Sequence, residues 1–281
     1  MTGPVVCGVD ISESARSVVD TARWLAEGVG SHLIVVHAAE EPSSEAEEFA
    51  TNVHNRLGAA DHEVRLAEGA PAEALVHAVA AEHAEYVVVG SRGQTALRAG
   101  MFGSVSRAVS ARSPAPVVVV PPRISGAPEA DREQRSVVCG VDGSEHALRA
   151  VRVAGRLARD LDCRLLLVHA VPDIPATASY LGARATNPPL SGQSDARAQR
   201  AAQIVADAVD SVDADAIGVV EVGAPWEVLE HVAERESGWL VVIAARGRGA
   251  VTTARFGSVA ARLATSARRP VVMIPELAET R

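Results

Sequence analysis

The sequence contains no lysine, so all 27 of its basic residues are arginine. This absence excludes a lysine-dependent P-loop, a kinase-type phosphate lysine and any Schiff-base mechanism. Aromatic residues make up only 3% of the 281 residues, so the cores must be built mainly from Val, Leu, Ile and Ala. No apolar run approaches the roughly 20 residues that cross a bilayer. We therefore expect no membrane partner.

Cysteine is also scarce. The three cysteines, Cys7, Cys139 and Cys163, have no C-x-x-C spacing, which argues against a disulfide framework or a zinc site. We expect the three cysteines to be small hydrophobic residues of the core. We also expect a cytoplasmic protein, because no signal peptide is recognisable at the N-terminus. The net charge of −8 disfavours nucleic-acid binding, which needs clustered cations.

The chain is a tandem repeat. "VVCGVDISESA" from Val5 matches "VVCGVDGSEHA" from Val137, and "LIVVHA" at 33–38 matches "LLLVHA" at 165–170, both at an offset of 132 residues. Further along, "EGAPAEAL" at 68–75 matches "VGAPWEVL" at 222–229 at an offset of 154. The second half therefore carries a 22-residue insertion. We predict domains at 1–123 and 135–281, joined by a Pro-rich and charged linker at 124–134.

Each half alternates short β-branched runs with helical patterns. In the first half, strands are expected at 5–9, 33–37, 64–67, 86–89 and 117–120, with helices between them and Ser12 as N-cap of the first. The Pro/Gly/Ser-rich insertion at about 172–195 is predicted to be a surface loop. Near-continuous Val, Ile and Leu strands indicate a sheet buried on both faces. The expected fold is α/β: two tandem, doubly wound, five-stranded parallel-sheet sandwiches, Rossmann-like, with strand order 3-2-1-4-5.

A glycine-rich turn follows the fourth strand. Gly90, Gly93, Gly103 and Ser104 form the pattern G-x2-G-x9-G-S. The first two glycines allow close approach of a ligand, and the last pair opens a helix whose free amides suit phosphate. In the expected topology, this turn meets Asp10 at the switch point where the winding of the sheet reverses, which is where α/β folds bind ligands.

Together, "GVD", "VVHA", "EGAPAEAL" and the long glycine pattern resemble the ATP-binding branch of the universal stress protein family, over nearly the whole chain. The resemblance implies a fold like that of the adenine nucleotide alpha-hydrolases, and ATP as ligand with Mg2+ or Mn2+ on its phosphates rather than on side chains. It also implies pairing of the two domains through their fifth strands. A homodimer is expected as well.

Site residues follow from the resemblance by position. Asp10 and Ala38 would meet the nucleoside, Gly90 and Gly93 the ribose and phosphates, and Gly103, Ser104 and Val105 the phosphates. The corresponding positions in the second half are Asp142, Ala170, Gly247, Gly257, Ser258 and Val259. Two departures stand out: Ala244 replaces Gly90, where its methyl group would crowd the ribose, and Ile11 replaces Gly143.

Other readings remain open for single residues. Asp10 and Asp142 could simply accept amide hydrogen bonds at a helix entry. His37 and His169, at the ends of the second strands, are interpreted as hydrogen-bonded strand-end histidines rather than metal ligands, because no partner stands at ligand spacing.

No nucleophile–base arrangement is visible, so no catalytic residue is predicted. Three functions are compatible with the sequence. The preferred one is a non-catalytic, ATP-binding regulator of stress response or dormancy. The alternatives are a slow ATPase or nucleotide-dependent transferase that uses the same pocket, and a nucleotide-free scaffold.

Overall fold

The structure, a computed structural model, describes residues 3–41, 43–92, 102–122, 135–171, 191–247 and 256–276. The predicted linker at 124–134 and Gly93 lie outside these residues, as does most of the predicted surface loop. Among the described residues, no helix has the length and apolarity that crossing a bilayer requires.

The two halves have the same succession of elements. The first contains β1 (Val5–Val9), α1 (Ala15–Val29), β2 (Leu33–Ala39), α2 (Ser44–Leu57), β3 (His62–Glu68), α3 (Pro71–Ala81), β4 (Tyr86–Gly90), α4 (Ser104–Arg112) and β5 (Val117–Val120). The second contains β6 (Ser136–Gly140), α5 (Glu145–Asp160), β7 (Arg164–Val171), α6 (Ser191–Asp210), β8 (Ala216–Val222), α7 (Pro225–Arg235), β9 (Gly238–Ala244), α8 (Ser258–Ser266) and β10 (Val271–Ile274).

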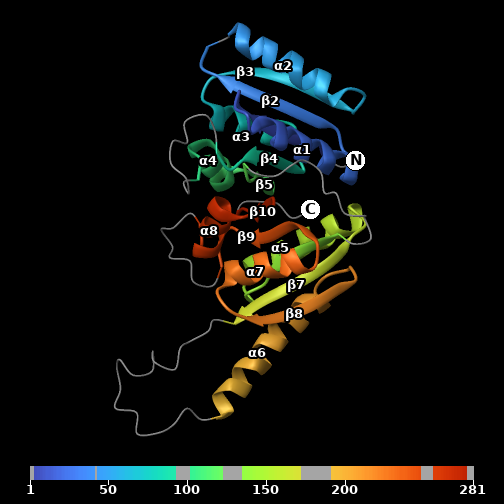
Figure 1. Cartoon of the computed structure of the whole chain (residues 1–281), viewed down its shortest axis with the longest axis vertical. Coiled ribbons are helices and arrows are strands. Elements are labelled where there is room, and N and C mark those ends of the chain that lie inside the picture. The colour runs from blue at the N-terminus through green and yellow to red at the C-terminus, as the bar shows by residue number, and fades with distance from the viewer. Residues whose placement is uncertain are drawn as a thin grey trace, which may run out of the picture.

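All ten strands form one sheet, in the order β3-β2-β1-β4-β5-β10-β9-β6-β7-β8. Within each half the order is the predicted 3-2-1-4-5 and the strands are parallel. The halves meet where β5 and β10 pair antiparallel, with Val118 opposite Val272 (Figure 1). The predicted pairing of the two halves through their fifth strands is therefore confirmed, and it joins two sheets into one.

Helices cover both faces of the sheet. One core lies between the sheet and α1, α2, α5 and α6, and the other lies between the sheet and α3, α4, α7 and α8. The central strands are apolar because both faces are covered, and all four residues of β5 and of β10 are buried. Full burial of one such side chain contributes about 1.5–3 kcal/mol. The edge strands β3 and β8 are partly exposed, and β3 carries charged residues.

The first helix begins later than predicted, and the cause lies in the preceding turn. In the second half, Gly143 has φ +76°, a left-handed conformation that glycine adopts readily, and Ser144 caps α5 by accepting a hydrogen bond from the Ala147 amide at 3.1 Å. Ile11 takes the place of that glycine, and a β-branched residue disfavours such a turn. The predicted N-cap, Ser12, is thus wrong: Ser14 is the N-cap of α1 and makes no side-chain cap bond.

The predicted surface loop at 172–195 also needs correction at its end. Helix α6 begins at Ser191, so its first five residues fall in the segment predicted as loop. Their composition, with Gly192 and two serines, gave no helical signal, because neither apolar periodicity nor a helix-favouring run is present.

The seam between the halves contains aromatic and charged groups as well as the paired strands. Trp24 of α1 and Trp239 of β9 have ring centroids 3.7 Å apart. Glu85, just before β4, is half-buried, and its Oε2 has no hydrogen-bond partner. Burial raises the pKa of the Glu85 carboxyl, the charge of Asp160 in the other half raises it further, and Arg156 opposes both effects.

We predict that Glu85→Gln stabilises the protein at pH 7. A carboxyl whose pKa is raised on folding stabilises the fold below its unfolded pKa, and this contribution is lost as the pH rises through the folded pKa. Ionised Glu85 therefore costs stability at neutral pH, and the variant avoids this cost.

Thermal unfolding followed from pH 4 to 8 checks the prediction: the melting temperature of Glu85→Gln should exceed that of the wild type at pH 7 and approach it near pH 4. Glu82→Gln, which removes a partner of Arg65 at the same end of β4, is the control and should give no such gain. An equal gain in both variants would contradict the role given to Glu85.

Candidate functional site

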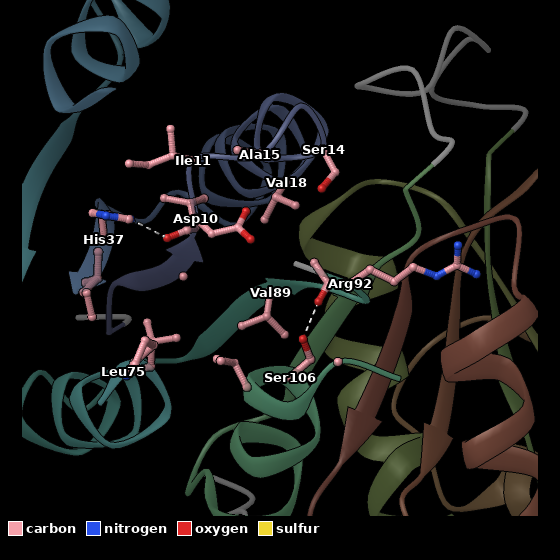
Figure 2. Close-up of a pocket in the computed structure, with 18 of the residues that line it drawn as sticks. Asp10, Ile11, Ser14, Ala15, Val18, His37, Leu75, Val89, Arg92 and Ser106 are labelled. Atoms are coloured by element: carbon pink, nitrogen blue, oxygen red, sulfur yellow. Dashed lines mark hydrogen bonds between the residues drawn. The ribbon is translucent and has the colours of Figure 1, made fainter. Parts of the chain in front are cut away.

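A crevice of about 750 Å³ opens at the carboxyl ends of β1, β2 and β4. The first turns of α1 and α4 form two of its walls, and the side chains of Val18 and Leu75 contribute to its lining. Figure 2 shows Asp10, Val18, Val89 and Ser106 around one common space, with Arg92 extending outward from it. The crevice lies between β1 and β4, the switch point at which α/β sheets hold their ligands.

Six of the seven positions predicted for the first site line this crevice. They are Asp10, Ala38, Gly90, Gly103, Ser104 and Val105. The seventh, Gly93, lies outside the described residues. Residues from three separate parts of the chain therefore meet in one place, as the strand order requires.

Asp10 has a structural role at the helix entry. Its Oδ1 accepts hydrogen bonds from the Ser12 hydroxyl at 2.5 Å and from the Ser12 amide at 3.3 Å. In the second half, Asp142 Oδ1 accepts from the Ser144 amide at 2.9 Å. Both aspartates thus accept amide hydrogen bonds at a helix entry, as the alternative interpretation of the sequence predicts. Because Asp10 also lines the crevice, this role is compatible with a ligand contact.

The strand-end histidines brace the crevice. His37 Nδ1 donates to the Val9 carbonyl at 3.0 Å, and His169 Nδ1 donates to the Val141 carbonyl at 2.7 Å. A carbonyl only accepts, so Nδ1 carries the proton in both rings. These bonds tie the end of the second strand to the end of the first. Among the residues that the structure describes, no group of three or more potential metal ligands occurs.

The start of α4 lines the crevice and has no side-chain cap. Its N-cap, Gly103, has no side chain to accept from the first turn, and the first amides of a helix have no partner within the helix. The Gly103 amide is used otherwise, donating to the Ser91 carbonyl at 2.9 Å. The Ser106 hydroxyl donates to the Gly90 carbonyl, which holds α4 against the end of β4. This is the geometry in which proteins bind phosphate.

Two arginines add positive charge at this wall. Arg92 and Arg107 both line the crevice, and neither side chain has a hydrogen-bond or ion-pair partner among the described residues. Neither arginine is among the site positions predicted from the sequence, although Arg92 lies in the glycine-rich turn. For Arg107, the available signal was its place in the first turn of α4, three residues after Ser104. Ser14, Ser43 and Glu45 were also missed, because only the tertiary fold brings them to the crevice.

The second half repeats the arrangement. The Gly257 amide donates to the Ala245 carbonyl at 2.8 Å, as Gly103 does to Ser91. A Cβ on Gly247 would lie 2.5 Å from Asp142 Oδ2, so this carboxylate packs directly on the glycine. The remaining predicted positions follow from the repeat: Ala170 is near the end of β7, and Ser258 and Val259 begin α8. β5 and β10 are antiparallel, so the carboxyl ends of these two strands point in opposite directions.

The structure explains why alanine is accepted at 244. A Cβ on Gly90 would lie 3.3 Å from Val18 Cγ2 and 3.1 Å from the Arg92 carbonyl oxygen. Gly90 does not have a positive φ, so only space opposes a side chain there. In the second half, Ala150 takes the place of Val18 and is fully buried, and Ala244 packs in the same core. The methyl of Ala244 is thus directed towards α5, where the smaller neighbour makes room for it.

These features define a protein with two tandem, doubly wound α/β halves. The first half has a crevice at the switch point of its sheet, next to the start of a helix. A family model described as "Universal stress protein family" matches residues 1–121 and 134–275. The chain therefore belongs to the universal stress protein family.

Among curated relatives, a universal stress protein of Mycobacterium tuberculosis is 31% identical over 196 residues, which are 68% of this chain and 61% of that protein. A universal stress protein of Thermus aquaticus is 31% identical over 132 residues, covering 41% of this chain and 96% of the relative. The chain thus aligns with less than two thirds of the mycobacterial relative.

Among solved structures, a universal stress protein from Archaeoglobus fulgidus has a TM-score of 0.63 with this chain at 18% identity, covering 98% of this chain and 99% of that one. At this identity the likeness shows the fold alone. It extends over both halves and so bears out the tandem architecture.

We predict that Gly90→Ala lowers the free energy of unfolding by about 1–2 kcal/mol, since the methyl group meets Val18 and overpacks the site. The same substitution in a Val18→Ala background should cost less, with a coupling of about 1 kcal/mol. Urea unfolding of the four proteins of this cycle measures the coupling.

The second half supplies a reciprocal control. Ala150→Val places the larger side chain beside the existing methyl of Ala244, and it should destabilise by a similar amount. Additive costs for Gly90→Ala and Val18→Ala would show that the two positions do not compensate each other.

Proposed function

We propose that the crevice of the first half binds ATP, and that the protein acts as a nucleotide-dependent regulator of stress response or dormancy without catalysing a reaction of its own. The observation that carries this proposal is the wall formed by the uncapped start of α4 together with Arg92 and Arg107. Amides at a helix N-terminus and two arginines without partners among the described residues form a strong anion site in a chain of net charge −8.

The other end of the crevice suits the nucleoside. Ala38, near the end of β2, offers its backbone to the base, and Asp10 offers a carboxylate to the sugar hydroxyls. The space of about 750 Å³ falls in the range of small-molecule and cofactor pockets. In this orientation the triphosphate extends past Gly90 towards Gly103 and Ser104.

A divalent cation fits this scheme as a companion of the phosphates. Mg2+ prefers oxygen ligands and usually takes only one or two from the protein, the rest from phosphate and water. Because Asp10 lies at the nucleoside end, such an ion would take its ligands from the phosphates, from water and at most from the Ser104 hydroxyl at the start of α4. The ion would neutralise phosphate charge and thereby strengthen binding.

Regulation by ATP requires that the nucleotide bind two conformations of the protein with different affinity. The crevice provides a means, since it joins the starts of α1 and α4 to the ends of three strands. Pairing of two chains into a homodimer, like the identity of a protein partner, stays a prediction.

We predict that Gly103→Asp weakens ATP binding by about a hundredfold, because it places a carboxylate beside the phosphates. Isothermal titration calorimetry with Mg-ATP measures the affinity. Ala59→Asp, an equal change of charge on the exposed turn after α2, is the control and should leave the affinity within twofold of the wild type. Unchanged affinity in Gly103→Asp would show that the phosphates lie elsewhere.

We further predict that ATP turnover stays below about 0.01 s⁻¹, far under the typical enzyme value of about 10 s⁻¹. Phosphate release at saturating Mg-ATP measures it, with Asp10→Ala and Asp10→Asn as comparisons. Faster turnover that both Asp10 variants abolish would instead favour the slow ATPase or transferase.

A further inference from the structure

The residues of the second half that match the lining of the first crevice, here called the second crevice, differ from it in their charges. Arg246 stands where Arg92 stands in the first half, and its Nη1 forms an ion pair with Glu276 Oε2 at 2.9 Å. Arg149 of α5 holds the same residue from the other side, donating from Nη1 to the Glu276 carbonyl at 2.9 Å. Glu276 is thus fixed at two points, one just after β9 and one on the first turns of α5.

The first half has no equivalent of this bridge. By the offsets of the repeat, Pro122 takes the place of Glu276 and Ser17 takes the place of Arg149. Proline offers no carboxylate, and Arg92 consequently has no ion-pair partner among the described residues. The difference is therefore encoded in the residues themselves.

The cation of α4 is also missing from α8. Arg107 lines the first crevice, whereas Ala261 occupies the matching position on α8. Among the described residues, the first crevice thus presents two arginines without partners, and the second presents one arginine, which already holds a carboxylate. The backbone framework, in contrast, is alike in both halves, with Gly257 and Gly103 making matching hydrogen bonds.

We propose that Glu276 serves as an internal anion for the second crevice, occupying Arg246 in place of a ligand phosphate, so that each chain binds one nucleotide, in its first half. This inference rests on the proposed function. A carboxylate and a phosphate compete for the same guanidinium group, and the carboxylate also repels the phosphate charge. Side chains of the pair are 25% and 53% exposed, so the competition is moderate and can be relieved by one substitution.

The test isolates the second crevice. Gly103→Asp weakens binding at the first crevice by about a hundredfold. In this background, any gain in Mg-ATP binding that a substitution in the second half produces is therefore assigned to the second crevice. Adding Glu276→Gln should strengthen this remaining binding by about tenfold. Adding Ala261→Arg as well supplies the missing cation and should strengthen it further. In the wild type, native mass spectrometry should find one ATP per chain.

Glu236→Gln is the matched control. Glu236 is also an acidic partner of arginines in the second half, Arg164 and Arg235, but it lies at the opposite end of the strands. It should leave the remaining binding unchanged. The reciprocal change, Pro122→Glu in the otherwise intact protein, should weaken ATP binding at the first crevice by about tenfold.

The outcomes separate the two hypotheses. Absence of ATP binding in the wild type overturns the proposed function. One strong site in the wild type with no gain from Glu276→Gln overturns the internal-anion role and leaves the proposed function standing. Two equivalent sites in the wild type likewise overturn the internal-anion role and leave the proposed function standing. A gain from Glu276→Gln that Glu236→Gln lacks supports the inference.

Discussion

The antiparallel pairing of β5 with β10 is the interaction on which the rest of the structure depends. Each strand has only four residues, all of them buried, and each would be an apolar edge if left alone. Their pairing removes both edges, joins the halves into one sheet and brings Trp24 of the first half against Trp239 of the second. It also fixes how the two halves are placed relative to each other, because the strands of both belong to one sheet.

Within this common framework the two copies have diverged in linked groups of residues. The methyl of Ala244 is accommodated because Ala150 replaces Val18, and Ala260 replaces the Ser106 whose hydroxyl holds the end of β4 in the first half. Close packing explains this linkage, because an interior without voids transmits each change of volume to its neighbour. The backbone at the crevice stays the same while its side chains and charges change.

Hydrophobic periodicity and the repeat are strong signals, and they were sufficient to predict the fold and the convergence of the glycine-rich turn and Asp10 on one crevice. The pairing of the halves followed from the family resemblance. The sequence could not predict the start of α1, which depends on the φ that Ile11 avoids and Gly143 adopts. Nor could it predict Arg107, or the ion pair of Arg246 with Glu276, which joins residues 30 positions apart. Nor could it predict that Ala150, in place of Val18, leaves room for the methyl of Ala244 within the protein; whether this methyl crowds a ribose stays a prediction.

The way the halves are joined has a consequence for the electrostatic field of the molecule. In each half the strands are parallel and the connecting helices return against them, so positive helix ends gather at the carboxyl ends of the strands. A single half is therefore an electric dipole. Although β5 and β10 are antiparallel, the twist of the sheet turns the outer strands, so that β2 and β7 end on the same side of the molecule (Figure 1). The dipoles of the two halves therefore add in part, and the molecule attracts anions towards that side.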